Sequence, residues 1–168
     1  MSVAQAVREY LARTNIDYDN IEHRKTACSS ETALASFVPA DELAKAVVIK
    51  AKDRYLLSIV PCSEKVDLEE VGELIGEPVT LATEKEIEAL FPDCERGAIP
   101  PIAAAYGMEA LVDESLDEKD DIYFEAGDHT TLVHVSGATF ARLMNHAPHS
   151  RLCMEDNKPI LFVSPYRS

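Results

Sequence analysis

The segment Gly97–Pro101, with the sequence GAIPP, has residue types that acyl chemistry can use. A glycine permits a positive φ or a close approach of the backbone, and two consecutive prolines stiffen the exit from the loop. Such a loop can direct main-chain N–H groups, here those of Gly97, Ala98 and Ile99, at a carbonyl oxygen or an oxyanion. The same spacing also fits an ordinary tight turn, so the motif alone does not decide between the two interpretations.

Lys45 is the second candidate, because it opens the strand-like run Ala46–Ala51 (AVVIKA). A lysine at the start of a buried strand can extend its ammonium into a cleft, while the strand fixes the origin of the side chain. Its compact positive charge suits a phosphate or a carboxylate. The alternative interpretation is a solvated lysine at a strand end.

The third candidate is the polar turn AGDHT at residues 126–130, which lies between two predicted strands. Gly127, Asp128 and His129 could line a pocket at this turn. They could equally do no more than close a hairpin, because glycine and aspartate are common turn residues.

Several other kinds of site are not indicated. The sequence contains none of the motifs typical of serine hydrolases, zinc proteases, P-loop proteins or dinucleotide-binding folds. His146 and His149 are three residues apart, but Pro148 between them disfavours a rigid pair of ligands, so we expect no metal and no cofactor. The cysteines lie far apart without a CxxC pair and are expected to be reduced thiols: Cys28, Cys62, Cys94 and Cys153.

The composition is that of one globular domain. The chain has 168 residues, of which 46% are hydrophobic and 27% charged, so it can bury a core of its own. It contains no apolar run long enough to span a membrane, and its N-terminus lacks the apolar stretch of a signal peptide. We therefore expect a cytoplasmic protein with no membrane partner.

The net charge of −14 argues against a nucleic-acid partner in general, and we do not expect DNA to bind. Nearly all of the acidic excess comes from residues 66–128, so the rest of the chain can still form a local basic patch. Its members would be Lys45, Lys50, Lys52 and Arg54, together with Arg24 and Lys25. The alternative is a solvated acidic face with scattered lysines.

Local patterns predict the elements that must hold these candidates in place. Apolar spacing predicts a helix over residues 3–14, the stretch 17–25 is a weak strand candidate, and a capping cluster at 28–32 begins a short helix. The runs 46–51 and 55–60, separated by three polar residues, predict a β-hairpin. Asp67 with Glu70 predicts the start of a helix, and Gly76 its end.

The second half of the chain mixes strands and helices. A strand is predicted at 78–81, a helix after the capping box of Thr83 and Glu86, strands at 109–112, 121–124 and 131–135, and a last helix after Ser136. Their irregular alternation predicts a single α/β domain, a mixed β-sheet with flanking helices, over residues 1–145. Residues 146–168 would form a C-terminal tail or an added edge strand, with Ile160–Val163 as the strand candidate.

In this order the candidates resemble the YbaK / prolyl-tRNA synthetase-associated editing domain family. The matching features are the N-terminal helix, Lys45 before AVVIK, the GAIPP loop, and the segment IYFEAGDHTTLVHVSG followed by a short helix. Each feature is weak alone, but the set in this order is fairly specific. It covers residues 3–145 and leaves residues 146–168 unexplained.

The resemblance implies hydrolysis of the ester between tRNA and a wrongly attached small amino acid, such as alanine, cysteine, serine or threonine, often on proline tRNA. Lys45 would engage the phosphate region of the terminal adenosine, and N–H groups of the loop that begins at Gly97 would bind the ester carbonyl. The residues expected to line the substrate pocket are Pro100, Pro101, Gly127, Asp128 and His129. The implied partners are the acceptor end of a charged tRNA and, for some members, an aminoacyl-tRNA synthetase.

Two other functions fit the same residues. An editing fold without turnover could act as a tRNA- or ligand-binding sensor that signals through residues 146–168. A hydrolase could instead use Cys62 or Cys94 as its nucleophile. If editing is the function, the acidic charge predicts weak binding to the body of the tRNA and recognition confined to its single-stranded 3′ end.

Overall fold

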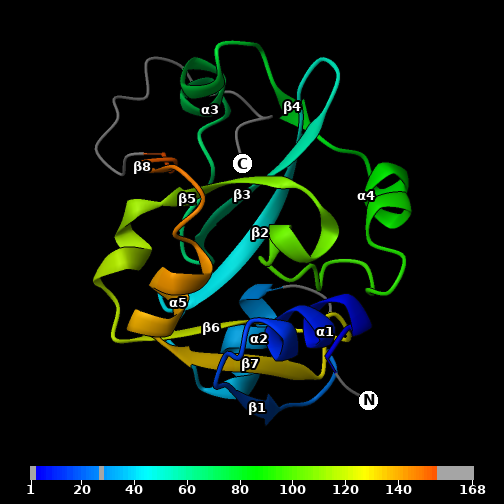
Figure 1. The fold of residues 1–168 in the computed structure, drawn as a ribbon, viewed down its shortest axis with the longest axis vertical. Helices are drawn as coiled ribbons and strands as arrows, with labels where there is room; N and C mark the ends of the chain where they lie inside the picture. Colours follow the sequence, from blue (N-terminus) through cyan, green and yellow to red (C-terminus); the bar gives the residue numbers. More distant parts are fainter. Residues whose placement is uncertain (1–2, 27–28, 155–168) are drawn as a thin grey trace.

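The computed structural model describes residues 3–26 and 29–154. Within them the chain forms one mixed β-sheet of eight strands, in the order β1-β7-β6-β2-β3-β5-β8, with β4 placed beside β2 (Figure 1). The strands are β1 (Asp19–Glu22), β2 (Leu43–Lys50), β3 (Tyr55–Pro61), β4 (Thr80–Leu81), β5 (Glu109–Asp113), β6 (Asp121–Glu125), β7 (Thr131–Ser136) and β8 (His149–Ser150). The prediction of a mixed-sheet α/β domain is confirmed.

Five α-helices flank this sheet in the described part of the chain. They are α1 (Gln5–Arg13), α2 (Ser29–Ser36), α3 (Leu68–Ile75), α4 (Glu84–Leu90) and α5 (Gly137–Leu143), with 3₁₀ turns η1 (Ala103–Tyr106) and η2 (Glu114–Glu118). Their predicted caps are present. Asp67 accepts from the first turn of α3, Gly76 ends that helix in the left-handed region, and Thr83 forms a capping box with Glu86 at the start of α4.

The predicted hairpin is confirmed, but its first strand begins earlier than the sequence suggested. β2 and β3 pair antiparallel from Ala44 opposite Pro61 to Lys50 opposite Tyr55. β2 starts at Leu43 because Leu43 and Ala44 also pair with β6, a parallel strand far along the chain. Lys45 therefore lies inside the strand, as its third residue, and not at its start.

One edge of β2 is shared by two different strands. β6 pairs with the beginning of β2, at Leu43 and Ala44, and β4 pairs with its end, at Ile49 and Lys50. Between these two ladders, the carbonyl of Val48 accepts a hydrogen bond from the N–H of Ala82 at 3.0 Å. The sheet thus opens beside the middle of β2.

The two faces of the sheet are covered differently. One face carries the main core, in which Leu57 and Phe124 pack with Leu11 of α1 and Phe140 of α5. The opposite face packs against α3 around Val71 at one end and against α2 at the other. Because side chains alternate along a strand, the side chain of Lys45 projects from this second face, between α2 and α3.

The folded body continues past residue 145, where the sequence analysis placed a boundary. β8 pairs with the end of β5, Cys153 pairs with Val66, and Leu152 is fully buried. The candidate strand Ile160–Val163 lies outside the described residues. No helix in the described ranges is both long and apolar enough to cross a membrane.

Candidate active site

The GAIPP loop and the polar turn between β6 and β7 lie against each other. The N–H of Glu95 donates to the carbonyl of Gly127 at 2.7 Å, and Nε2 of His129 donates to the carbonyl of Arg96. The ammonium of Lys25 pairs with the carboxylate of Glu95 at 2.5 Å. These contacts tie the residues just before Gly97 to the turn, so the loop is held from outside as well as by its prolines.

Within the loop, Gly97 adopts φ +81°, a left-handed conformation that favours glycine. Pro100 and Pro101 are buried and have no N–H to offer. The N–H of Ala98 donates to the carbonyl of Glu95 at 3.1 Å, which closes the turn. Among the described residues, no acceptor takes the N–H of Gly97 or of Ile99. The loop therefore offers two unengaged amides, with the Ala98 amide already used internally.

The loop also lies beside the middle of β2. Gly97 and Ile99 line a pocket of about 260 Å³ together with Ala46, Val47 and Val48. The rest of its wall comes from the β4–α4 segment: Leu81, Ala82, Glu84 and Ile87. This pocket occupies the opening of the sheet between β6 and β4. Its lining begins at Ala46, the residue directly after Lys45.

Lys45 itself is half-buried and lies one residue from this wall. Its ammonium makes no ion pair with a carboxylate of the described residues. Burial first, and then Asp113, raises the pKa of Cys153, whereas the positive charge of Lys45 acts to lower it. This electrostatic contact places the Lys45 charge on the α2–α3 face of the sheet.

A buried polar cluster, which has no clear signature in the sequence, lies on the same face. Glu125 and His129 are 2% and 3% exposed, and Oε2 of the glutamate lies 3.6 Å from Nδ1 of the histidine. Thr32 of α2 donates to the same oxygen at 2.8 Å and shares a 2.5 Å hydrogen bond with Thr26. The register pairs Leu43 with Tyr123, so Lys45 and Glu125, each two residues further on, leave the same face of neighbouring strands.

The cluster can hold and exchange a proton. Burial raises the pKa of Glu125 to about 6, while hydrogen bonding to Thr32 and the nearby His129 act in the opposite direction. Because Nε2 of His129 donates to Arg96, Nδ1 of the neutral ring carries the lone pair. That Nδ1 and Oε1 of Glu125 are buried without a hydrogen-bond partner among the described residues. A carboxyl whose pKa lies this close to neutrality is suited to general acid–base chemistry.

Gly127 and Asp128 have roles in the turn itself. Gly127 adopts φ +112°, and a Cβ there would lie 2.9 Å from Cβ of Ala4. Burial acts to raise the pKa of Asp128, but hydrogen bonds from Thr130 and Thr131 outweigh it and leave the pKa below its usual value. Both residues line a separate hollow of about 700 Å³ next to α1. Of the three predicted turn residues, His129 is the one whose side chain reaches the residues just before the loop.

Cys94 has the wrong protonation state for a nucleophile. Burial raises its pKa to about 12, although its hydrogen bond with Tyr106 opposes the change. Since the thiolate is the reactive form, Cys94 is not activated for attack at neutral pH. Cys62 is buried under α2. Cys28 lies outside the described residues.

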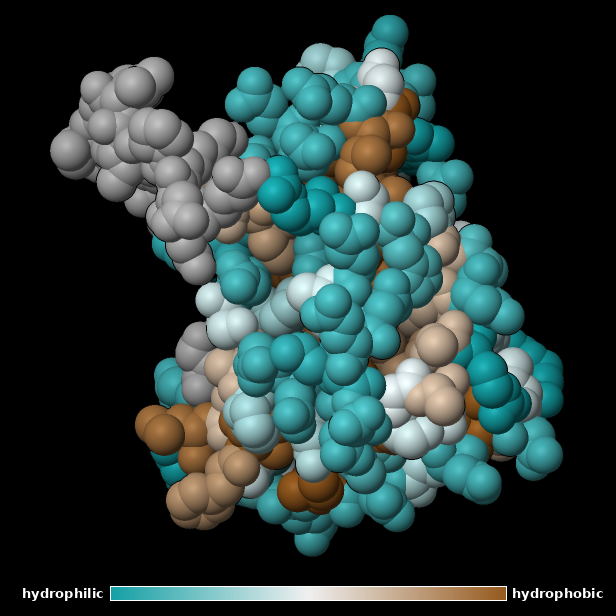
Figure 2. Space-filling view, turned by 90° about the vertical axis from the view of Figure 1, so that its left-hand side faces the viewer, coloured by the Kyte–Doolittle hydropathy of each residue, from teal (hydrophilic) through white to brown (hydrophobic). Residues whose placement is uncertain are grey.

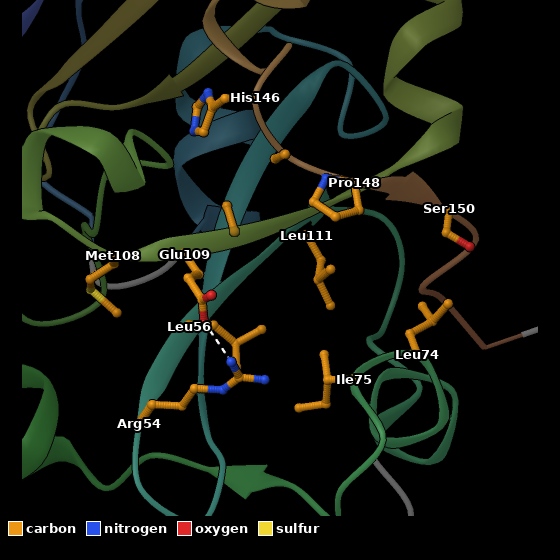
Figure 3. A pocket seen from close by; sticks show the side chains of 12 residues that line it. Arg54, Leu56, Leu74, Ile75, Met108, Glu109, Leu111, His146, Pro148 and Ser150 are labelled. Carbon is orange, nitrogen blue, oxygen red and sulfur yellow. Dashed lines mark ion pairs between the residues drawn. The ribbon is translucent and has the colours of Figure 1, made fainter.

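The histidines near the end of the body do not form a pair of metal ligands. His149 donates through Nδ1 to Asp117 and through Nε2 to the carbonyl of Met144, both at 2.9 Å. Both of its nitrogens are therefore used. His146 instead lines an apolar pocket of about 400 Å³ between β5 and the end of α3 (Figure 3), and none of the predicted site residues is part of its lining. In the described ranges, no group of three or more His, Cys, Asp or Glu side chains is arranged to hold a metal.

Comparison with known proteins identifies one family. A sequence profile of the aminoacyl-tRNA editing domain matches residues 22–143. These residues include Lys45, the GAIPP loop and the turn that carries His129. No curated protein sequence matches the chain.

Several solved structures share the fold of this chain, although their sequence identity to it is low. A crystal structure described as that of "a putative trans-editing enzyme for prolyl tRNA synthetase" has a TM-score of 0.79 at 21% identity and covers 90% of this chain and 97% of its own. The hypothetical protein APE2540 has a TM-score of 0.79 at 19% identity, covering 89% of this chain and 100% of its own. A "putative signal transduction protein" from Marinobacter aquaeolei VT8 has a TM-score of 0.74 at 15% identity and covers 89% of this chain but only 30% of its own.

Proposed function

Because the chain belongs to the aminoacyl-tRNA editing domain family, we propose that it hydrolyses the ester between tRNA and a wrongly attached small amino acid. One observation carries the proposal. Gly97 and Ile99 line a pocket at the opening of the sheet, next to the strand that carries Lys45, and neither N–H has an acceptor among the described residues. An aminoacyl ester is already activated, so stabilising its oxyanion and orienting it are the main requirements for catalysis.

In the proposed reaction, a water molecule adds to the ester carbonyl carbon, and the bond from that carbon to the ribose oxygen then breaks. The proton from the water goes to the ribose oxygen, so the products are the free amino acid and deacylated tRNA. Charge that develops on the carbonyl oxygen is stabilised by the two loop N–H groups, each of which typically contributes about 3 to 4 kcal/mol in such sites. The contact between His129 and Arg96 keeps the loop in place, so little reorganisation is needed.

Lys45 would bind the phosphate of the terminal nucleotide. Its ammonium has no carboxylate partner in the described part of the chain and starts from a strand that is paired along its length with β3. A lysine without a competing ion pair is free to neutralise an incoming phosphate, and the rigid strand restricts the positions that its ammonium can reach.

The proposed substrate is a small amino acid. The pocket, of about 260 Å³, is large enough to admit an aminoacyl group. Steric exclusion of a larger, correct amino acid is the principle of a second sieve. The proposed substrate class, taken from the family match, is alanine, cysteine, serine or threonine attached to proline tRNA. The same proposal has the enzyme act in the cytoplasm, with the tRNA acceptor end and an aminoacyl-tRNA synthetase as its partners.

A panel of mischarged tRNAs tests this function. We expect loss of the ester from at least one tRNA carrying a small amino acid and none from correctly charged prolyl-tRNA. Lys45→Ala should lower kcat/KM roughly 10- to 100-fold, the effect of losing one charged hydrogen bond, without lowering the melting temperature. Lys52→Ala, which removes an exposed lysine from the β2–β3 turn, is the matched control. The catalytic proposal is wrong if no member of the panel is hydrolysed.

A binding module is the second candidate, and one observation favours it. In the Marinobacter aquaeolei structure the same fold makes up 30% of a longer chain described as a signal transduction protein. A module of this kind would bind the acceptor end of tRNA without breaking the ester. Binding of a mischarged tRNA with a fully stable ester would support this second function over the first.

A further inference from the structure

Phe37 has an environment and a backbone conformation that do not suit phenylalanine. Its side chain is 94% exposed, and Leu34, one turn earlier in α2, is 74% exposed. Its φ is +58°, in the left-handed region. The position directly after a helix is commonly left-handed, but glycine usually occupies it because a Cβ is unfavourable there. Phe37 therefore exposes an aromatic ring at a position where glycine would be better for folding.

The turn itself does not require the ring. The N–H of Phe37 donates to the carbonyl of Leu34 at 3.3 Å, and the N–H of Val38 donates to Ala33 at 3.0 Å. Both are main-chain bonds that glycine at position 37 would also permit. Nothing in the described packing of α2 explains an aromatic side chain at position 37. The ring is therefore expected to contact a molecule other than this chain.

Phe37 directly follows the helix that contacts the buried cluster. Thr32, five residues earlier, donates to Glu125 in that cluster. At 1.5 Å per residue, five residues of α2 correspond to a rise of about 7.5 Å along its axis. An acceptor end that runs from the cluster along α2 would bring its terminal base to Phe37.

The charge next to α2 suits the same ligand. Arg24 is exposed and makes no ion pair with a described carboxylate. It lies two residues before Thr26, whose hydroxyl shares a hydrogen bond with Thr32. A free guanidinium at this place is complementary to the phosphates that adjoin the terminal base.

We propose that Phe37 is a binding residue whose ring stacks on the terminal base of the tRNA acceptor end. Single-stranded RNA ends are commonly bound by stacking of unpaired bases on aromatic side chains, and such stacking does not need a particular base. The inference rests on the proposed function, because it assumes that the ester of a charged tRNA occupies the site.

Phe37→Gly separates this role from a structural one. Glycine removes the ring and relieves the left-handed strain, so the melting temperature should stay the same or rise by roughly 2 to 4 °C. KM for the mischarged tRNA should rise roughly 5- to 150-fold, as expected for the loss of one stacked base, with little change in kcat. Phe37→Trp should restore the lower KM. Leu74→Ala, which removes an exposed leucine from α3 at the apolar pocket of Figure 3, is the control and should leave KM unchanged.

Binding of an uncharged single-stranded RNA ending in CCA, measured by calorimetry, provides a readout that does not depend on hydrolysis. The wild-type chain should bind it several-fold more tightly than Phe37→Gly. Equal binding and equal KM in the two proteins would overturn the stacking role, and so would a clear fall in melting temperature. If the wild-type chain binds the RNA through Phe37 but hydrolyses no ester, the proposed enzyme activity fails while the binding role stands.

Discussion

Gly97 is the residue at which backbone conformation and the proposed chemistry can be separated. Gly97→Ala places a Cβ at φ +81°, which costs about 1 to 2 kcal/mol, and shifts the loop amides. If these amides stabilise the oxyanion, kcat should fall roughly 10²- to 10³-fold. Gly76→Ala is the matched control, since Gly76 has φ +80° and no atom within 4 Å of its would-be Cβ. Similar melting temperatures with a loss of turnover in Gly97→Ala alone are expected. Unchanged turnover would place the oxyanion site elsewhere.

Glu125 predicts a defined pH dependence of stability. Burial raises its pKa from 4.5 to about 6, so the folded state binds this proton more tightly than the unfolded chain. Its contribution is most favourable below the unfolded pKa and is lost as the pH rises through the folded pKa. The free energy of unfolding should therefore fall between about pH 4.5 and 6, by an amount on the order of 2 kcal/mol.

Urea unfolding of Glu125→Gln beside the wild type isolates this contribution. The difference in unfolding free energy between the two proteins should depend on pH over that interval and become constant above it. A difference that does not change with pH would mean that the Glu125 carboxyl has the same pKa in the folded and unfolded states.

At the residue scale, the sequence indicates the GAIPP loop and the polar turn but not the residues that contact them. Gly97 and His129 stand out because glycine–proline loops and polar turns are local features, and the structure places them in contact through Arg96. Glu125 is harder to find, because a single acidic residue in an apolar strand is usually exposed to solvent. The preceding residues Tyr123 and Phe124 pack into the cores on opposite faces of the sheet, which indicates that both faces of β6 are covered. The Ala98 amide could not be excluded as a donor without knowing that Glu95 accepts from it.

At the element scale, α4 is positioned by a cap that can be tested directly. The hydroxyl of Thr83 accepts from the N–H of Glu86 at 3.2 Å, and the glutamate accepts in return from the N–H of Thr83 at 2.9 Å. Thr83→Ala should lower the free energy of unfolding by about 1 kcal/mol, and Thr83→Ser, which keeps the hydroxyl, should not. Turnover should be unchanged well below the melting temperature. Equal stability of the two variants would show that the cap contributes little.

Elements defined by local signals are predicted well, and those defined by distant pairing are not. The hairpin of β2 and β3 and the caps of α3 and α4 need only neighbouring residues, so the sequence patterns indicate them. The start of β2 depends on pairing with β6, whose partners Tyr123 and Phe124 lie about half the chain away. For the same reason, the opening of the sheet between β6 and β4 has no local signature, although it creates the pocket beside Lys45.

The whole molecule combines a strongly acidic exterior with a site proposed to bind nucleic acid. The face shown in Figure 2 is mostly hydrophilic, with hydrophobic residues in small separate areas. Several described basic side chains are already paired with carboxylates, among them Lys25, Lys50, Arg54 and Arg96. Lys45 and Arg24 have no such partner in the described ranges, so they remain to contact phosphate. Long contact with the tRNA body would place phosphates against this acidic exterior.

This charge distribution predicts a weak salt dependence of tRNA binding. Each neutralised phosphate contributes a slope of roughly −0.7 to −0.9 to the logarithm of affinity against the logarithm of salt concentration. With contacts from Lys45 and Arg24 only, affinity should fall roughly tenfold between about 50 and 200 mM salt. Proteins that make six to ten phosphate contacts lose about 10³ to 10⁵ over the same range. A CCA-ended single strand and the complete tRNA should then show nearly the same slope. A much steeper slope for the complete tRNA would mean that its body is bound by basic residues other than Lys45 and Arg24.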